Sequence, residues 1–321
     1  MEINKSNLNL QKVDIKTAQL FCENSKQSSF FTNPKYICNF EKTIDWWIVS
    51  KGQEKICLWP IFKSKDHKVD LPLFSYYFGP VWSDSYMQSS NHSQLSKRNN
   101  VFDIFLKKFI QEYTNLVSQL NFSDHDIRFF IWWNNNKQKE FKIYPKYSSV
   151  IEDLSKKSEN DIIMNFRELR RRMLKKAQKN QNILLSHDFT YDEIISLYKE
   201  TLKRKSQEVE KNVPEKIKTF YDLCSKNYCK MIGYREKSSG KLISIILIAY
   251  DNKTSNLVLN LSSFDWKDSG VTALNMLNAI KYTKDNGLNN FDFNGANSPI
   301  GADDKQSYGG NYKLYFEIKL D

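Results

Sequence analysis

The fold of this 321-residue chain is indicated first by the segment Phe291-Asp292-Phe293-Asn294-Gly295, with Lys305-Gln306-Ser307-Tyr308-Gly309 shortly after it. Residues 290–294 have the length and apolar content of a short buried strand. Residues 313–320 alternate apolar and polar side chains, which predicts a closing strand. The glycines and aspartates between these two strands predict a loop, and this loop carries Lys305.

The residues before this segment predict a sheet with one helix inserted. Residues 229–235 are predicted to be extended, and residues 242–250 are nearly all apolar, as in a strand buried on both faces. Residues 257–262 return as a third strand. A helix from Val271 to Asp285 follows, and Gly287 ends it. The order is therefore strand, strand, strand, helix, strand.

Helices are predicted ahead of this sheet. Residues 161–179 carry one apolar stripe at helical spacing, formed by Ile162, Phe166, Leu169, Met173 and Ala177. The sequence Thr190-Tyr191-Asp192-Glu193 is a capping box that opens a second helix. Pro214 starts a third helix, which runs through Leu223.

The first half repeats the order of hairpin, strand, helix and strand. Strands are predicted at 46–49, 56–62 and 73–78, a polar loop at 83–100, a helix at 101–120, and a last strand at 127–133. Pro145 and the pair Ser148-Ser149 interrupt the pattern. The predicted fold class is α/β with mixed α+β sheets, in two domains: residues 1–150, the more irregular copy, and residues 151–321.

The chain is basic, with a formal net charge of +11. Residues 1–150 carry 20 Lys+Arg against 14 Asp+Glu, and residues 151–321 carry 28 against 23. The excess is spread evenly, which favours anionic partners such as nucleotide-linked sugars, phospholipid headgroups, CoA or RNA. A composition rich in Lys and Asn for reasons unrelated to binding is the alternative.

Cysteines, histidines and apolar segments restrict the chemistry. The five cysteines form no CxxC or Cys/His cluster, so reduced thiols and no metal site are predicted. The four histidines stand in polar, loop-like surroundings and are interpreted as surface residues. The start of the chain has no apolar segment, and no run is long enough to cross a bilayer. These features predict a cytoplasmic protein without a transmembrane segment, and they leave open a contact with the inner face of a membrane.

The set of motifs resembles the Fem-like branch of the GNAT superfamily, to which peptidyltransferases belong. The closing segment is similar to the family's FDxxG…(F)KxxFG ending. Residues 170–178 (RRRMLKKAQ) resemble the Arg-rich helix that opens the second domain, residues 201–204 (TLKR) its TxxR element, and residues 78–81 (FGPV) the GPV piece of the first domain. The resemblance implies two GNAT-like domains in tandem with a cleft between them. It also implies transfer of an aminoacyl or other acyl group to an amine.

The resemblance assigns roles to individual residues. Lys305 matches a lysine held near the reacting carbonyl, so its implied role is to stabilise the oxyanion; a surface lysine is the alternative. Arg204 and Lys205 are implied to bind the phosphates of an anionic, carrier-linked acceptor. The remaining substrate-binding candidates are Tyr250, Asn294, Asn297, Tyr308 and Tyr77.

This sequence also departs from the family pattern. Asp304 stands where the family has Phe, Tyr308-Gly309 replaces the family's FG, and the acid that often follows GPV is shifted to Asp84. The departure in the first domain concerns the position of this acid.

The acyl donor is left between aminoacyl-tRNA and acetyl-CoA, and no tightly bound cofactor is predicted. CoA-using GNAT enzymes hold the pyrophosphate with a glycine-rich loop at a helix N-terminus. Residues 265–273 (DWKDSGVTA) contain one glycine and two aspartates, which disfavours CoA at this place.

A basic helix is the last candidate for a partner-binding element. The basic side chains of this helix are Arg167, Arg170, Arg171, Arg172, Lys175, Lys176 and Lys179. They could contact tRNA phosphates or an anionic membrane, or form an ordinary solvated helix face.

The leading hypothesis is an acyltransferase of cell-envelope or surface-glycan synthesis. It would act on the amine of a nucleotide- or lipid-linked sugar or peptide. One alternative is an acetyl-CoA-dependent N-acetyltransferase of amino sugars. The other is a tandem GNAT protein that binds without catalysis.

Overall fold

The computed structural model describes residues 8–41, 43–87, 92–124, 126–135, 139–204 and 211–321. The chain forms two compact units: residues 1–146 together with 314–321, and residues 147–313. The predicted domains divide at 150/151 instead. The last eight residues belong to unit 1 and not to the second domain, because Ile318 and Leu320 are buried in its core. The cleft predicted between the domains stays a prediction.

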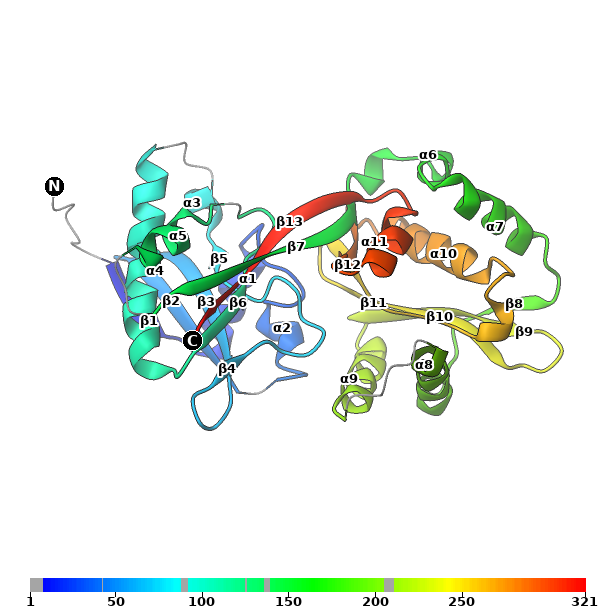
Figure 1. Cartoon of the computed structure of the whole chain (residues 1–321), viewed down its shortest axis with the longest axis horizontal. Coiled ribbons are helices and arrows are strands. Elements are labelled where there is room, and N and C mark those ends of the chain that lie inside the picture. Colours follow the sequence, from blue (N-terminus) through cyan, green and yellow to red (C-terminus); the bar gives the residue numbers. More distant parts are fainter. Residues whose placement is uncertain (1–7, 42, 88–91, 125, 136–138, 205–210) are drawn as a thin grey trace. The chain divides into compact units, whose positions relative to one another are not determined.

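Unit 1 is an antiparallel sheet with helices packed on it (Figure 1). Its sheet has the order β1-β2-β3-β4, with β5 also paired to β3, and β6 pairs separately with the end of β13. The strands are β1 (Leu8–Lys12), β2 (Ile44–Lys51), β3 (Glu54–Lys63), β4 (Val69–Asp70), β5 (Val81–Trp82), β6 (Leu116–Gln119), the start of β7 (Phe141–Ile151) and the end of β13 (Asn311–Leu320). The helices are α1 (Ile15–Glu23), α2 (Pro34–Ile37), α3 (Asp84–Met87), α4 (His92–Glu112) and α5 (Arg128–Asn134).

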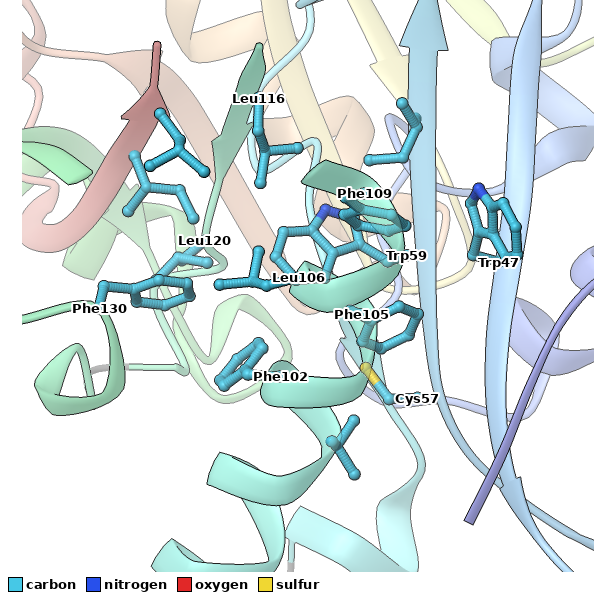
Figure 2. Close-up of a cluster of buried hydrophobic side chains, with 14 of the residues drawn as sticks. Trp47, Cys57, Trp59, Phe102, Phe105, Leu106, Phe109, Leu116, Leu120 and Phe130 are labelled. Atoms are coloured by element: carbon cyan, nitrogen blue, oxygen red, sulfur yellow. The ribbon is translucent and has the colours of Figure 1, made fainter. Parts of the chain in front are cut away.

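Aromatic rings fill the core of unit 1 (Figure 2). Phe102, Phe105 and Phe109 lie on one side of α4, and all three rings meet Trp59 of β3 edge to face. These rings are at most 1% exposed. Many of the aromatic side chains in the first half of the sequence therefore pack in this core, where each ring buries a large apolar area.

Four predictions for unit 1 are wrong. Residues 116–119 form strand β6 and are not the end of the preceding helix, and residues 127–133 are mostly helix α5 and not a strand. Residues 73–78 contain a turn and a bend instead of a strand, and the predicted loop at 83–100 contains α3 and the start of α4. Short segments of this kind carry too few periods of apolar residues to separate the two conformations.

Unit 2 is a mixed sheet of order β7-β12-β11-β10-β9-β8. Its strands are the end of β7, β8 (Ile183–Ser186), β9 (Cys229–Glu236), β10 (Leu242–Tyr250), β11 (Thr254–Ser262), β12 (Asn290–Gly295) and the start of β13. Its α-helices are α6 (Glu159–Met164), α7 (Glu168–Gln178), α8 (Tyr191–Arg204), α9 (Val213–Ser225), α10 (Val271–Asp285) and α11 (Pro299–Gln306). Two 3₁₀ turns complete the unit, η1 (Leu154–Lys156) and η2 (Phe264–Trp266).

Helices cover both faces of this sheet, with α7 and α10 on one side and α8 and α9 on the other (Figure 1). Strand β10 is consequently buried on both faces, apart from Tyr250 at its end. This confirms the strand predicted from the apolar run at 242–250. The predicted helix from Val271 to Asp285 is also confirmed, as is the capping box, in which Thr190 N–H donates to Glu193 at 2.8 Å.

The single helix predicted at 161–179 is wrong, because the chain breaks it into α6 and α7. Asn165 caps the end of α6, and the N–H of Arg167 donates to the carbonyl of Ser307 at 2.8 Å. Leu169, a member of the predicted buried stripe, is 50% exposed. A bond to a residue far along the chain therefore ends the helix where the local pattern predicts continuation.

Candidate active site around the end of strand β12

The two parallel strands of unit 2 separate soon after they meet. Residues 254–256 of β11 pair with residues 290–292 of β12. The next carbonyl of β11, that of Leu257, accepts a hydrogen bond from the side-chain amide of Asn294 at 2.8 Å. The side chain of Asn294 thus bridges the two strands where backbone pairing stops.

Asn294 has a left-handed backbone, with φ of 57°. Asparagine tolerates this conformation better than most residues because its short polar side chain bonds locally. The N–H of Asn294 donates to Asp292 Oδ1 at 2.7 Å, and the hydroxyl of Ser148 donates to the same oxygen. Asp292 and Asn294 are 1% exposed and Ser148 is fully buried. This buried network fixes the sharp turn that ends β12.

Lys305 lies directly over this turn. Its Nζ donates to the carbonyl oxygen of Asn294 at 3.2 Å and to that of Gly295 at 2.5 Å. The predicted loop that carries Lys305 is helix α11, which starts at Pro299 and is capped by the side chain of Ser298. Lys305 is partly buried, so the structure places an ammonium group, held by two carbonyls, at the end of β12.

Two arginines tie α11 to α7. Arg167 forms a two-pronged ion pair with Asp303, with N···O distances of 3.0 and 2.5 Å. Arg170 donates to Asp304 and, at 2.7 Å, to the hydroxyl of Ser307. The hydrogen bonds from Arg167 lower the pKa of the Asp303 carboxyl. Asp304, which departs from the family's Phe, therefore has a structural partner on α7.

Tyr308 is a core residue, which corrects its prediction as a substrate-binding side chain. It has no exposed surface, and its ring stacks on Phe293 and meets Phe166 edge to face. The guanidinium of Arg170 covers the ring, with 4.9 Å from Cζ to the centroid. Burial raises the pKa of its hydroxyl. A substrate would have to displace this packing to reach Tyr308.

Tyr250 lies at the other end of the strands from Lys305. Tyr250 pairs with Ser255, and Ser255 pairs with Phe291 at the start of β12. Lys305 contacts Gly295, four residues further along and beyond the turn at Asn294. The strand pairing therefore does not bring Tyr250 to this turn, and its role in substrate binding stays a prediction.

Three further candidates belong to unit 1 or have side chains outside what is described. Tyr77 is 3% exposed in unit 1 and packs edge to face against Phe122 and Tyr315, so it is a core ring and not a pocket residue. Arg204 is the last residue of α8, and its side chain is not described. Lys205 lies outside the described residues, so the phosphate-binding role of both stays a prediction.

Asn297 does lie beside the turn. It is exposed, and its Oδ1 accepts a hydrogen bond from the N–H of Tyr147 at 2.7 Å. The N–H of Ala296 donates to the carbonyl of Tyr147 at 2.6 Å. Of the substrate-binding candidates whose side chains the structure describes, Asn294 and Asn297 are thus the two at the turn that Lys305 contacts. Ser148 and Tyr147, which take part in the same turn, were not predicted because nothing in the local sequence links them to a strand so far along the chain.

The loop before α10 packs closely against α7. Gly270 has φ of 82°, and a Cβ at this position would lie 2.1 Å from the carbonyl oxygen of Met173. The N–H of Val271 already donates to Ser269 Oγ at 3.2 Å. The beginning of α10 is therefore partly occupied by the protein's own contacts.

Much of the basic cluster on α7 has a structural role. Besides Arg167 and Arg170, Arg171 donates to the carbonyls of Met164 and Phe166, and Lys176 donates to the carbonyl of Asp268. The exposed remainder of the cluster is formed by Arg172, Lys175 and Lys179. The predicted contact with tRNA or a membrane therefore rests on fewer side chains than the sequence suggests.

The cysteines and histidines add no second site to the part of the chain that the structure describes. All five cysteines are free, and burial raises the pKa of Cys22 and Cys224 to about 12. His67 and His187 are exposed; the side chain of His92 and all of His125 lie outside the description. Within the described ranges no His, Cys, Asp and Glu side chains gather as a metal site. Nor does any helix there have the length and apolar content to span a membrane.

Three solved structures match nearly the whole chain in fold. A structure of FemX matches with a TM-score of 0.69 at 10% identity, over 96% of both chains. L-PGS from Bacillus licheniformis matches with a TM-score of 0.55 at 10% identity, over 96% of this chain and 92% of that one. A tandem GNAT protein from the clavulanic acid biosynthesis pathway matches at 0.51 and 9% identity, over 98% of both chains.

By sequence comparison, neither a protein-family model nor a curated protein matches the chain. The likeness is therefore one of fold, and it extends over both units. It confirms the predicted α/β fold class and the predicted resemblance. The chain has the Fem-like form of the tandem GNAT fold.

Proposed function

We propose that this protein is an acyltransferase that moves an aminoacyl or simple acyl group onto an amine of a nucleotide- or lipid-linked sugar or peptide. The observation that carries the proposal is the position of the Lys305 ammonium, held by the carbonyls of Asn294 and Gly295 at the end of β12. The Fem-like fold of the chain supports it.

Lys305 acts in this proposal by electrostatics. When an amine attacks an acyl carbonyl, negative charge develops on the carbonyl oxygen, and a fixed cation lowers the energy of that state. The two backbone carbonyls and the ion pairs that anchor α11 hold the ammonium in place beforehand. A reaction of this kind needs no covalent enzyme intermediate and no catalytic histidine.

The donor proposed is aminoacyl-tRNA and not acetyl-CoA. The loop before α10 has one glycine, two aspartates and a backbone that packs on Met173, so a pyrophosphate would meet negative charge and few open N–H groups. Titration calorimetry with acetyl-CoA tests this choice. Binding at micromolar concentration would favour the acetyl-CoA-dependent alternative.

Transfer assays test the role of Lys305. Purified protein is incubated with aminoacyl-tRNA carrying a labelled amino acid and with carrier-linked amino sugars and peptides, and labelled product is measured. Lys305→Ala should lower turnover by roughly 100-fold or more, in the range found when one oxyanion donor is removed. Lys281→Ala, which removes a lysine paired with Glu159 elsewhere in unit 2, is the control. Full turnover by Lys305→Ala would refute the role. No transfer from aminoacyl-tRNA, or from acetyl-CoA in a parallel assay, would favour the non-catalytic alternative.

A further inference from the structure

Two exposed tyrosines stand beside the turn that holds Lys305. Tyr147, on β7, is 44% exposed and Tyr312, on β13, is 50% exposed. Their ring centroids are 6.2 Å apart with the planes at 72°, an edge-to-face arrangement. In this arrangement each ring supports the other while part of both rings remains open to solvent.

The backbone fixes Tyr147 relative to the candidate active site. Its N–H and its carbonyl are bonded to Asn297 and Ala296, at 2.7 and 2.6 Å. Ala296 directly follows Gly295, whose carbonyl accepts from Lys305. The tyrosine pair is thus attached to the same rigid turn as the ammonium group.

Two ion pairs lie near the tyrosine pair, and the ammonium group of Lys305 is held by backbone carbonyls at the same turn. Arg167, which lies close enough to Tyr312 for an electrostatic interaction, is neutralised by Asp303, and Arg170 is neutralised by Asp304. The two carboxylates are exposed by 63% and 40%. A neutral ring with hydroxyl groups would find both hydrogen-bond donors and acceptors among these side chains.

We infer that Tyr147 and Tyr312 form a subsite that packs against a neutral sugar ring of the acceptor. The apolar C–H face of the sugar would lie on the exposed tyrosine surface, and its hydroxyls would reach the polar side chains around it, Asn297 among them. This inference rests on the proposed function and deepens it, because it selects a sugar over a peptide as the part of the acceptor next to Lys305.

Saturation-transfer NMR on the full chain tests the subsite without any acyl donor. The probes are the methyl glycoside of N-acetylglucosamine, the same sugar linked to UDP, and a single-stranded RNA ending in CCA. We expect saturation on the sugar-ring protons of both sugar probes. Tyr147→Ala and Tyr312→Ala should each weaken sugar binding roughly 5-fold, the effect of one lost ring contact. Tyr147→Phe and Tyr312→Phe should retain it.

Tyr144→Ala is the matched control, because Tyr144 lies on β7 as well and is 40% exposed, but belongs to unit 1. Circular dichroism verifies folding, and Tyr312→Ala decides alone if Tyr147→Ala is unfolded. The inference is overturned if no sugar probe receives saturation, if both Ala variants bind like the native chain, or if only the RNA probe loses binding. This experiment measures binding and not acyl transfer. Failure of the transfer assay can therefore be distinguished from failure of the sugar subsite.

Discussion

The carbonyl oxygen of Asn294 faces the ammonium group of Lys305, 3.2 Å away, because Asn294 turns the backbone at the end of β12 with a positive φ of 57°. The position of the candidate catalytic group therefore depends on the conformation of a residue eleven positions earlier. Substitutions that change this conformation should therefore shift the carbonyls that hold the ammonium group of Lys305.

Substitution of Asn294 should separate backbone strain from the lost side-chain bond. Asn294→Gly and Asn294→Ala both remove the amide that donates to Leu257, but only alanine resists the left-handed conformation. We expect Asn294→Ala to be less stable than Asn294→Gly by about 1 kcal/mol. Urea unfolding followed by circular dichroism measures the difference. Equal stability of the two variants would mean that the turn relaxes freely.

Gly270 should tolerate no side chain. In Gly270→Ala the new Cβ would lie 2.1 Å from the carbonyl oxygen of Met173, on a backbone with φ of 82°. We expect a loss of at least about 3 kcal/mol in the free energy of unfolding. Gly240→Ala is the matched control, since φ is 71° but nothing lies within 4 Å, and it should cost about 1 kcal/mol. Similar losses at both positions would argue against the close packing of α7 on α10.

Removal of two buried tyrosine hydroxyls, those of Tyr308 and Tyr113, should affect the stability of the protein differently. Among the described residues the hydroxyl of Tyr308 has no hydrogen-bond partner, whereas that of Tyr113 accepts from Trp47 at 2.8 Å and donates to Asp45 at 2.7 Å. Tyr308→Phe should leave stability unchanged or raise it by up to about 1 kcal/mol, and Tyr113→Phe should lower it by about 1–3 kcal/mol. Thermal and urea unfolding test this pair. A large loss in Tyr308→Phe would reveal a partner for its hydroxyl.

The ion pair of Glu193 with Arg235 should make the stability of the protein decrease as the pH falls below about 4.5. The hydrogen bond from Arg235 lowers the pKa of Glu193 from 4.5 to about 2. A lowered folded-state pKa contributes stability that is complete above the unfolded-state pKa and is lost as the pH falls towards the folded-state pKa. Glu193→Gln should therefore cost about 1–2 kcal/mol at pH 7, allowing for solvent screening, and almost nothing near pH 2.

Urea midpoints at pH 7, 4 and 2.5 follow this contribution through its range. Glu215→Gln, at an exposed carboxylate on α9, is the control and should have the same small effect at each pH. A destabilisation by Glu193→Gln that is as large at pH 2.5 as at pH 7 would contradict the assignment.

The local sequence was sufficient where an element carries its own pattern. Leu242 to Tyr250 was recognised as a strand because burial on both faces requires apolar residues at every position. It was insufficient for β6, at 116–119, whose extended form depends on pairing with β13 almost 200 residues later. The break between α6 and α7 has the same origin, since the bond from Arg167 to Ser307 joins distant segments.

The candidate site, like the fold, is predicted in part by the sequence. The motif placed Lys305, Asn294 and Asn297 together, and the structure brings these three to one turn. It did not distinguish Tyr308, which packs in the core, from a side chain that faces solvent. Spacing gives the order of residues along an element, whereas exposure depends on what packs against that element from elsewhere.

The sequence by itself determined the α/β class, the tandem arrangement and the lysine within the closing motif, because apolar periodicity and short motifs are local properties of the chain. Only the tertiary structure decided that residues 314–321 complete unit 1, that α7 anchors α11 through Arg167 and Arg170, and that Tyr147 and Tyr312 stand exposed beside Lys305. Each of these depends on contacts between residues more than a hundred positions apart, and such contacts follow from the burial of shared surfaces instead of any local pattern.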